Sequence, residues 1–335
     1  KALLAMAAVA AAGSAFAQSS VTLYGIADIW VGKQNQEFTS PNTITKGKVK
    51  AGSGGVKNTS RWGVKGSEDL GGGLKATFNL ESKVDLGNGA TNNPAAGTGQ
   101  MFDRQANVGM TGGFGTVKVG RSWNALDDMF GAANSGFDSD LAAQRVWLNS
   151  YTRAADAQIH YATPDFNGFN AAVSTQLNGN SANGASKVSA FNVTYTGGPV
   201  YVGVGYENDK GFKNLAGTAG GRKGTMINAS YDLGMAKLLG SVYNTKEPAG
   251  VKINSYQIGA DVPLSNGITV SVGYAASKPN GGDTNKAVSV AAAYSLSKRT
   301  TVYAGLRSEA VKQSNYNQFR KVDADFYAVG VNHKF

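Results

Sequence analysis

The chain has 335 residues and no cysteine, which excludes disulfides, thiolate catalysis and cysteine-bound zinc. Beyond the first residues, no run approaches the ~20 consecutive apolar residues of a membrane-spanning helix, so a helical membrane protein is also excluded. The net charge of +10 is compatible with nucleic acid, an anionic membrane or anionic solutes as partners.

The first 17 residues are predicted to be a secretory signal peptide. Lys1 is followed by an apolar run to Ala12 and then by Gly13-Ser-Ala-Phe-Ala17, which has the small-residue pattern of a cleavage site. We expect cleavage after Ala17 and a single mature domain over residues 18–335. Loss of Lys1 leaves 31 basic side chains against 22 acidic ones, a net charge of +9. Because an exported protein rarely meets nucleic acid, this excess favours membrane lipid or anionic solutes as partners.

From Ser20 onwards the sequence predicts antiparallel strands joined alternately by short and long connections. In residues 74–81, for example, Leu74 and Phe78 share one face and Lys75 and Glu81 the other, a period of two that a helix would not give. Sixteen strands are expected, at 21–30, 59–68, 74–81, 102–110, 115–123, 157–164, 169–177, 191–195, 200–206, 225–231, 237–243, 256–262, 268–274, 288–294, 301–306 and 322–335. An even number of such strands is typical of a bacterial outer-membrane β-barrel, an all-β fold.

Composition agrees with a membrane barrel. The 45 glycines suit tight turns, and a mean hydropathy of −0.23 is acceptable because only alternate residues face lipid. Aromatic residues mark the predicted strand ends next to short turns, as Tyr195, Tyr201, Tyr294 and Tyr303 do. We expect these four tyrosines to form an interfacial girdle. The loop after the first strand is rich in lysine, with Lys46, Lys48, Lys50 and Lys57.

The stretch from Gly120 to Asp156 lacks strand alternation. Loops of about thirty residues are uncommon in compact domains and are usually functional or disordered. If the flanking strands belong to a closed barrel, we expect this loop to fold inward and narrow the lumen. Its charged residues are Asp127, Asp128, Asp138 and Asp140 towards one end and Arg145 and Arg153 towards the other.

The last strand has a feature that a soluble strand does not need. Tyr327, Val329 and Val331 lie on one face together with His333, and the strand stops at Phe335. A barrel requires its final strand to pair with the first, because this pairing removes both sheet edges. We therefore expect Phe335, Val331, Val329 and Tyr327 to form the barrel-assembly signal.

These features resemble the Gram-negative general porins, especially the β-proteobacterial and neisserial branch. The resemblance covers essentially the whole mature chain. It is carried by Ser20-Val-Thr-Leu-Tyr-Gly25, Ser60-Arg-Trp-Gly-Val-Lys-Gly-Ser-Glu-Asp-Leu-Gly71, Phe102-Asp-Arg-Gln-Ala106, Phe114-Gly-Thr-Val-Lys-Val-Gly-Arg121, Tyr294-Ser-Leu-Ser-Lys-Arg-Thr300 and the terminal Phe335.

The resemblance implies a sixteen-stranded homotrimeric channel whose third outer loop folds into the pore. It also implies an outer-membrane location among lipid and lipopolysaccharide, and folding by the barrel-assembly machinery. Two departures concern the constriction: the central loop lacks the Pro-Glu-Phe-Gly motif of many relatives, and His160 precedes Tyr161 where many relatives have arginine. The size and charge of the constriction are therefore not carried over from the family.

Passive diffusion needs a charged, water-filled constriction rather than a catalytic group. Arg61 is the strongest candidate, because Trp62 and Val64 have the lipid-facing parity of their strand; a solvated strand-end arginine is the alternative. Arg104 matches a pore arginine of the family, although it shares its parity with Ala106, Val108 and Met110. Arg145 and Arg153 could complete a basic ladder facing Asp127, Asp128, Asp138 and Asp140, or could be ordinary loop charges.

Other functions have weaker support. Only His160 and His333 could act as histidine bases and neither lies beside a nucleophile motif, so we expect no enzyme activity. Asp138-Ser-Asp140 and Asp323-Ala-Asp325 lack the rest of a calcium loop, so neither metal nor cofactor is expected. The sequence thus predicts a general diffusion porin for small hydrophilic solutes and ions, with anion preference. A channel specific for an anionic or aromatic nutrient, and a surface adhesin or phage receptor, are the alternatives.

Overall fold

A computed structural model describes residues 19–38, 49–52, 55–91, 100–147, 151–177, 187–213, 220–264, 267–313 and 320–335. The predicted signal peptide, Lys46 and Lys48 lie outside these residues. The strands are β1 (Ser20–Phe38), β2 (Val49–Gly52), β3 (Arg61–Gly71), β4 (Leu74–Lys83), β5 (Gln105–Gly112), β6 (Gly115–Trp123), β7 (Ala154–Ala162), β8 (Phe169–Gln176), β9 (Val188–Gly197), β10 (Val200–Asp209), β11 (Arg222–Asp232), β12 (Lys237–Lys246), β13 (Lys252–Pro263), β14 (Ile268–Pro279), β15 (Asn285–Ser295), β16 (Thr300–Gln313) and β17 (Arg320–Lys334).

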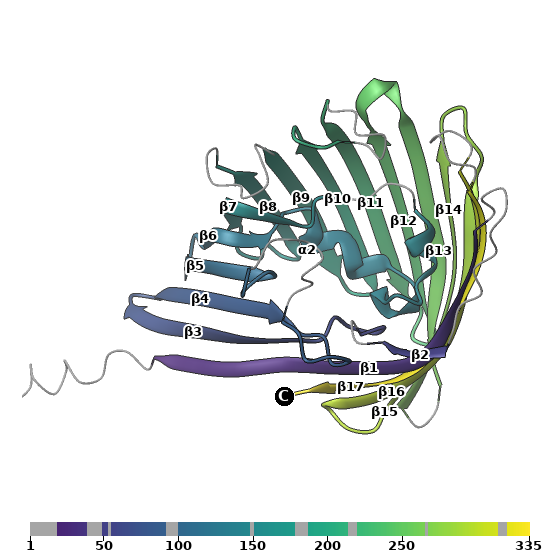
Figure 1. The fold of residues 1–335 in the computed structure, drawn as a ribbon. Coiled ribbons are helices and arrows are strands. Elements are labelled where there is room, and N and C mark those ends of the chain that lie inside the picture. Colours follow the sequence, from purple (N-terminus) through teal and green to yellow (C-terminus); the bar gives the residue numbers. More distant parts are fainter. Residues whose placement is uncertain are drawn as a thin grey trace, which may run out of the picture.

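The strands close on themselves as an antiparallel barrel (Figure 1). Among the described residues, β1 and β3–β17 form a ring of sixteen strands, as predicted, and the short β2 is added to the edge of β1. β1 closes the ring in two parts: residues 20–26 pair with β3 and residues 26–38 pair with β17. Within the described residues, no helix is long and apolar enough to cross a membrane.

Side chains alternate between the two faces of the wall. In β11 the pattern is strict, with Met226 and Asn228 buried and Ile227 and Ala229 exposed. The outward residues continue from strand to strand through the register, so that apolar side chains form an exposed row made of Val193, Val204, Ile227, Val242 and Tyr256. An apolar outer band and a polar interior are what a barrel in a lipid bilayer requires.

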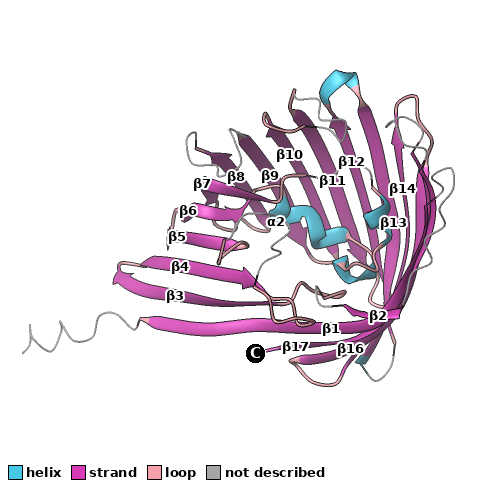
Figure 2. Ribbon diagram, in the orientation of Figure 1, coloured by secondary structure: helices cyan, strands magenta, loops and turns pink. Residues whose placement is uncertain are grey.

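The segment between β6 and β7, residues 124–153, contains short helices. These are α2 (Asp127–Phe130) and the 3₁₀ turns Gly131–Ala133, Gly136–Asp138 and Ala143–Val146; another 3₁₀ turn, Pro248–Gly250, follows β12. The helical part lies within the curve of the strands (Figures 1 and 2). It is held there by inward-facing side chains: Asn228 Nδ2 donates to Met129 O at 2.5 Å, and Gly136 N donates to Ser271 Oγ at 2.7 Å.

Glycines on the inner wall make room for this segment. A Cβ on Gly205 of β10 would lie 2.5 Å from Leu126 Cδ1 and 2.7 Å from Met129 Sδ. A Cβ on Gly259 of β13 would lie 2.6 Å from Ser135 Cβ, and one on Gly305 of β16 would lie 2.8 Å from Leu141 Cδ1. Real Cβ contacts are not this short, so the segment can approach the wall this closely only because these positions lack a side chain.

Only two of the four tyrosines that were predicted to form an interfacial girdle point outward. Tyr195 and Tyr294 have outward parity, whereas Tyr201 and Tyr303 point into the barrel. The reason is strand parity: Tyr201 lies two residues before the buried Gly203, and Tyr303 shares its face with Gly305 and Arg307. Tyr303 is 5% exposed, and its hydroxyl donates to Asp28 Oδ1 at 2.6 Å.

Candidate pore constriction

A pocket of about 790 Å³ lies between the 124–153 segment and the β1–β4 side of the wall. Its charged lining comprises Lys57, Arg61, Lys83, Arg145 and Arg153 together with Asp127, Asp128, Asp138 and Asp140. The acids come from the 124–153 segment, whereas Lys57, Arg61 and Lys83 come from the opposite side. Of the predicted constriction residues, Arg104 does not line this pocket.

Asp127 and Arg153 join the two ends of the segment. Arg153 Nε lies 3.0 Å from Asp127 Oδ1, and the Tyr151 hydroxyl donates to the same oxygen. Burial raises the pKa of the Asp127 carboxyl, although Arg153 and the Tyr151 hydrogen bond act in the opposite direction. Burial alone would lower the pKa of Arg153, but Asp127, Tyr151 and Asp138 together raise it, so this guanidinium stays charged.

Arg61 and Arg104 share one carboxylate. Glu81 of β4 accepts from Arg104 Nε at 2.5 Å, and its other oxygen lies 3.4 Å from Arg61 Nε. Parity would make Arg104 point outward together with Val108. It does not do so, because β5 begins at Gln105 and not at the predicted residue 102. Its guanidinium turns inward and lies over the Trp123 ring, 4.9 Å from the centroid, where it is buried.

The remaining predicted charges are paired within the segment or with the wall. Arg145 Nη2 lies 2.9 Å from Asp140 Oδ1, and Asn134 Nδ2 donates to Asp138 Oδ1 at 2.8 Å. Asp128 Oδ2 lies 2.8 Å from Nε2 of the buried His160 on β7. Of the arginines expected in a ladder facing the acids, Arg153 pairs with Asp127 and Arg145 pairs with Asp140.

A buried carboxylate holds both ends of the segment at one place on the wall. Glu207 of β10 accepts from Asn124 Nδ2 at 2.6 Å and from the Thr152 amide at 3.0 Å. Arg222 of β11 neutralises it, with Nη2 2.9 Å from Glu207 Oε1. Asn124 Oδ1 also accepts from the Asp127 amide at 3.0 Å, so this anchor is linked to the acidic side of the pocket.

Several residues of this pocket were not predicted as site residues. Lys57, Lys83 and an aromatic wall of Phe130, Trp147 and Tyr151 also line it. The alternation of β4 contained a usable signal, because Lys83 has the same parity as Lys75 and Glu81 and pairs with Arg61 in the register. No local pattern points to Lys57 or to the aromatic residues, because they lie in segments without alternation.

Comparison with known proteins agrees with this geometry. Residues 2–332 match the Gram-negative porin family. The chain is 34% identical over 328 residues to outer membrane porin protein 32 of Delftia acidovorans, covering 91% of this chain and 88% of the relative. It is 29% identical over 351 residues to major outer membrane protein P.IB of Neisseria lactamica, covering 95% of each.

Among solved structures, an anion-selective porin from Comamonas acidovorans matches with a TM-score of 0.78 and 26% identity, over 95% of this chain and 100% of that one. The chain belongs to the Gram-negative porin family. It is therefore an outer-membrane β-barrel channel for the diffusion of small hydrophilic solutes, not an enzyme.

Proposed function

We propose that this porin prefers anions and that the pocket beside the 124–153 segment is its constriction. The observation that carries the proposal is the meeting of Arg61, Arg145 and Arg153 with the acids of the segment around one pocket. Lys57 and Lys83 lie in the same lining, so basic side chains outnumber acidic ones there. The mature charge of +9 and the anion selectivity of the Comamonas acidovorans porin point in the same direction.

A field across a narrow, low-dielectric opening acts on every ion that passes. Arg61 supplies positive charge from the β3 wall, and its partner Glu81 is shared with Arg104, so this group of three carries a net positive charge. Anions are concentrated beside Arg61, whereas cations are attracted only towards the paired acids of the segment. The expected result is anion preference without exclusion of cations.

The test is the reversal potential of the purified protein in a planar bilayer under a KCl gradient, with R61A compared with wild type. A charge acting over 4 Å in water contributes ~1 kcal/mol, so R61A should lower the anion-to-cation permeability ratio by up to about fivefold. K223A, which removes an exposed outward lysine of β11, should leave the ratio unchanged. A wild-type reversal potential of cation-selective sign would refute the proposal.

The remaining expectations are proposals of the same kind. The protein acts as a homotrimer in contact with lipid and lipopolysaccharide, after removal of residues 1–17 and insertion by the barrel-assembly machinery. A Vibrio cholerae outer-membrane protein solved in a trimer form shares the fold, with a TM-score of 0.68 at 18% identity over 95% of this chain and 99% of that one. Three equal conductance steps for each insertion event would support the trimer, whereas single steps would contradict it.

A second candidate is a channel specific for anionic aromatic solutes. It is favoured by the aromatic wall, in which the Phe130 and Tyr151 rings lie 4.6 Å apart and Trp147 lines the same pocket as Arg153. Benzoate in excess chloride would then reduce the single-channel current with saturation, whereas acetate would not. Equal, unsaturable effects of both anions would leave general diffusion as the function.

A further inference from the structure

Residues 55–60, which precede β3, form a turn held inside the barrel. Asp28 of β1 is fully buried, and its carboxylate accepts from the amides of Val56 at 3.0 Å and Asn58 at 2.9 Å. The same carboxylate accepts from the Tyr303 hydroxyl at 2.6 Å and from Asn332 Nδ2 at 2.8 Å. One side chain thus binds residues 56–58 to the seam where β1, β16 and β17 meet.

Both ends of this turn are fixed as well. Ser60 Oγ donates to Asp28 O at 2.7 Å and accepts from Asp28 N at 2.9 Å. At the other end Gly55 has a φ of +74°, and a Cβ there would overlap the carbonyl of Asn58. Residues 55–60, which we call the inner turn, are therefore held by specific polar contacts.

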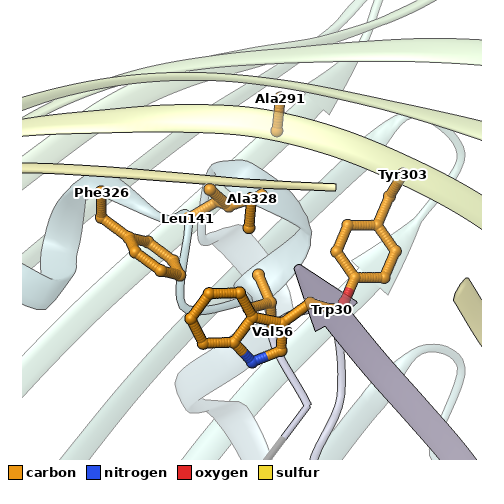
Figure 3. Close-up of a cluster of buried hydrophobic side chains, with 7 residues drawn as sticks. All are labelled: Trp30, Val56, Leu141, Ala291, Tyr303, Phe326 and Ala328. Carbon is orange, nitrogen blue, oxygen red and sulfur yellow. The ribbon is translucent and has the colours of Figure 1, made fainter. Parts of the chain in front are cut away.

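The inner turn also packs against the 124–153 segment. Val56 is buried in a cluster with Trp30, Leu141 and Phe326 (Figure 3). The amide of Asp140 donates to Val56 O at 2.8 Å. The inner turn and the 124–153 segment thus touch, and each supplies part of the lining of the same pocket.

Lys57 lies at the centre of the inner turn and lines the pocket. Its ammonium is 4.5 Å from the centroid of the Phe137 ring, and no ion pair within the described residues involves it. Burial lowers the pKa of this ammonium and Lys334 lowers it further, whereas Asp28 and Asp261 raise it. By contrast, Arg145 and Arg153 are each paired with an aspartate of the segment.

We infer that the inner turn is a second inward-folded part of the constriction and that Lys57 is a selectivity-determining residue of this channel. The inference rests on the proposal that the pocket is the constriction. No carboxylate forms an ion pair with the Lys57 ammonium in the described residues, so its field acts on passing ions and Lys57 contributes more to anion preference than a paired arginine does. Asp28 is the residue that positions it.

The lack of native cysteine permits a direct test by charge replacement. K57C should lower the anion-to-cation permeability ratio by about twofold to fivefold, the effect of one charge at close range. A methanethiosulfonate reagent carrying trimethylammonium should restore the ratio, and one carrying a sulfonate should lower it below that of unmodified K57C. K278C, at an exposed position of β14 outside the pocket, should show neither effect. K57M, which keeps the length of the side chain, replaces K57C if the cysteine variant does not fold.

The outcomes separate this inference from the proposal on which it rests. If R61A shifts the reversal potential while K57C or K57M matches wild type, the inference about Lys57 is wrong and the constriction stands. If neither Arg61 nor Lys57 affects selectivity, both are wrong. We expect both R61A and K57C to shift the reversal potential. We also expect the trimethylammonium reagent and the sulfonate reagent to change the permeability ratio of K57C in opposite directions.

Discussion

Asp127 is the residue through which pH should affect the anion preference of the channel. Burial raises the pKa of its carboxyl, whereas the pKa of its partner Arg153 is raised and this guanidinium stays charged. As the pH falls, Asp127 is therefore neutralised earlier than an ordinary aspartate, whose pKa is about 3.9. Each neutralised carboxylate makes the pocket more positive by one charge.

We therefore expect anion preference to increase as the pH is lowered from about 8 to about 4, with D127N more anion-selective and less dependent on pH over that range. The Tyr151 hydroxyl stabilises the charged carboxylate, so Y151F should move the midpoint to higher pH. Reversal potentials measured over this pH range for the three proteins provide the check. A wild-type profile parallel to that of D127N would contradict the prediction.

The comparison of Arg61 with Arg104 shows how far sequence reasoning reaches for single residues. Arg61 is the first residue of β3 but is already paired with Lys83 of β4, so its parity could be read from the sequence and it lines the pocket. Arg104 lies just before β5, where alternation does not apply, and its direction is set by Glu81 on the neighbouring strand. Parity predicts the direction of a side chain whose residue is paired in the sheet, but contacts between segments decide it for a residue beyond the paired part of a strand.

At the scale of elements, the 124–153 segment is positioned by the shape of the wall. Leu126 and Met129 are fully buried and lie against Gly205 of β10. The sequence predicted the segment, its charges and the sixteen strands around it. It did not predict where the segment docks, because the fit depends on glycines in strands far along the chain that look like ordinary small residues.

G205A should disturb this docking. Its Cβ would lie 2.5 Å from Leu126 Cδ1, and the buried neighbours leave no space for relief. Overpacking of this kind costs about 1–3 kcal/mol, so the free energy of unfolding in detergent should fall by that amount and the open-channel current should become noisier. G240A is the matched control, because the nearest atom to its Cβ would be 3.9 Å away. Equal stability of the two variants would show that the segment is not held by this contact.

At the scale of the whole molecule, the barrel depends on one seam. The pairing of β1 changes from β3 to β17 near Gly25, and Phe335 completes it there: Gly25 N donates to Phe335 O at 3.0 Å, and Phe335 N donates to Gly25 O at 3.1 Å. A Cβ on Gly25 would overlap the Phe335 ring, so the ring covers the backbone of the junction. On the outer face of β17, three side chains are exposed, as their predicted parity requires: Tyr327, Val329 and Val331.

Two variants of Phe335 distinguish its role in closing the barrel from its predicted role as a signal for the barrel-assembly machinery. Deletion of Phe335 removes both backbone hydrogen bonds, each contributing about 1 kcal/mol, and should lower the stability of the refolded barrel by about 2 kcal/mol. F335A keeps both hydrogen bonds and loses only the half-exposed ring, so its refolded barrel should lose less stability than the deletion variant. If the ring is the assembly signal, F335A should still accumulate poorly in the outer membrane of cells, whereas L306A, at an exposed position opposite Tyr327, should not. Normal outer-membrane levels of F335A would restrict Phe335 to closing the ring.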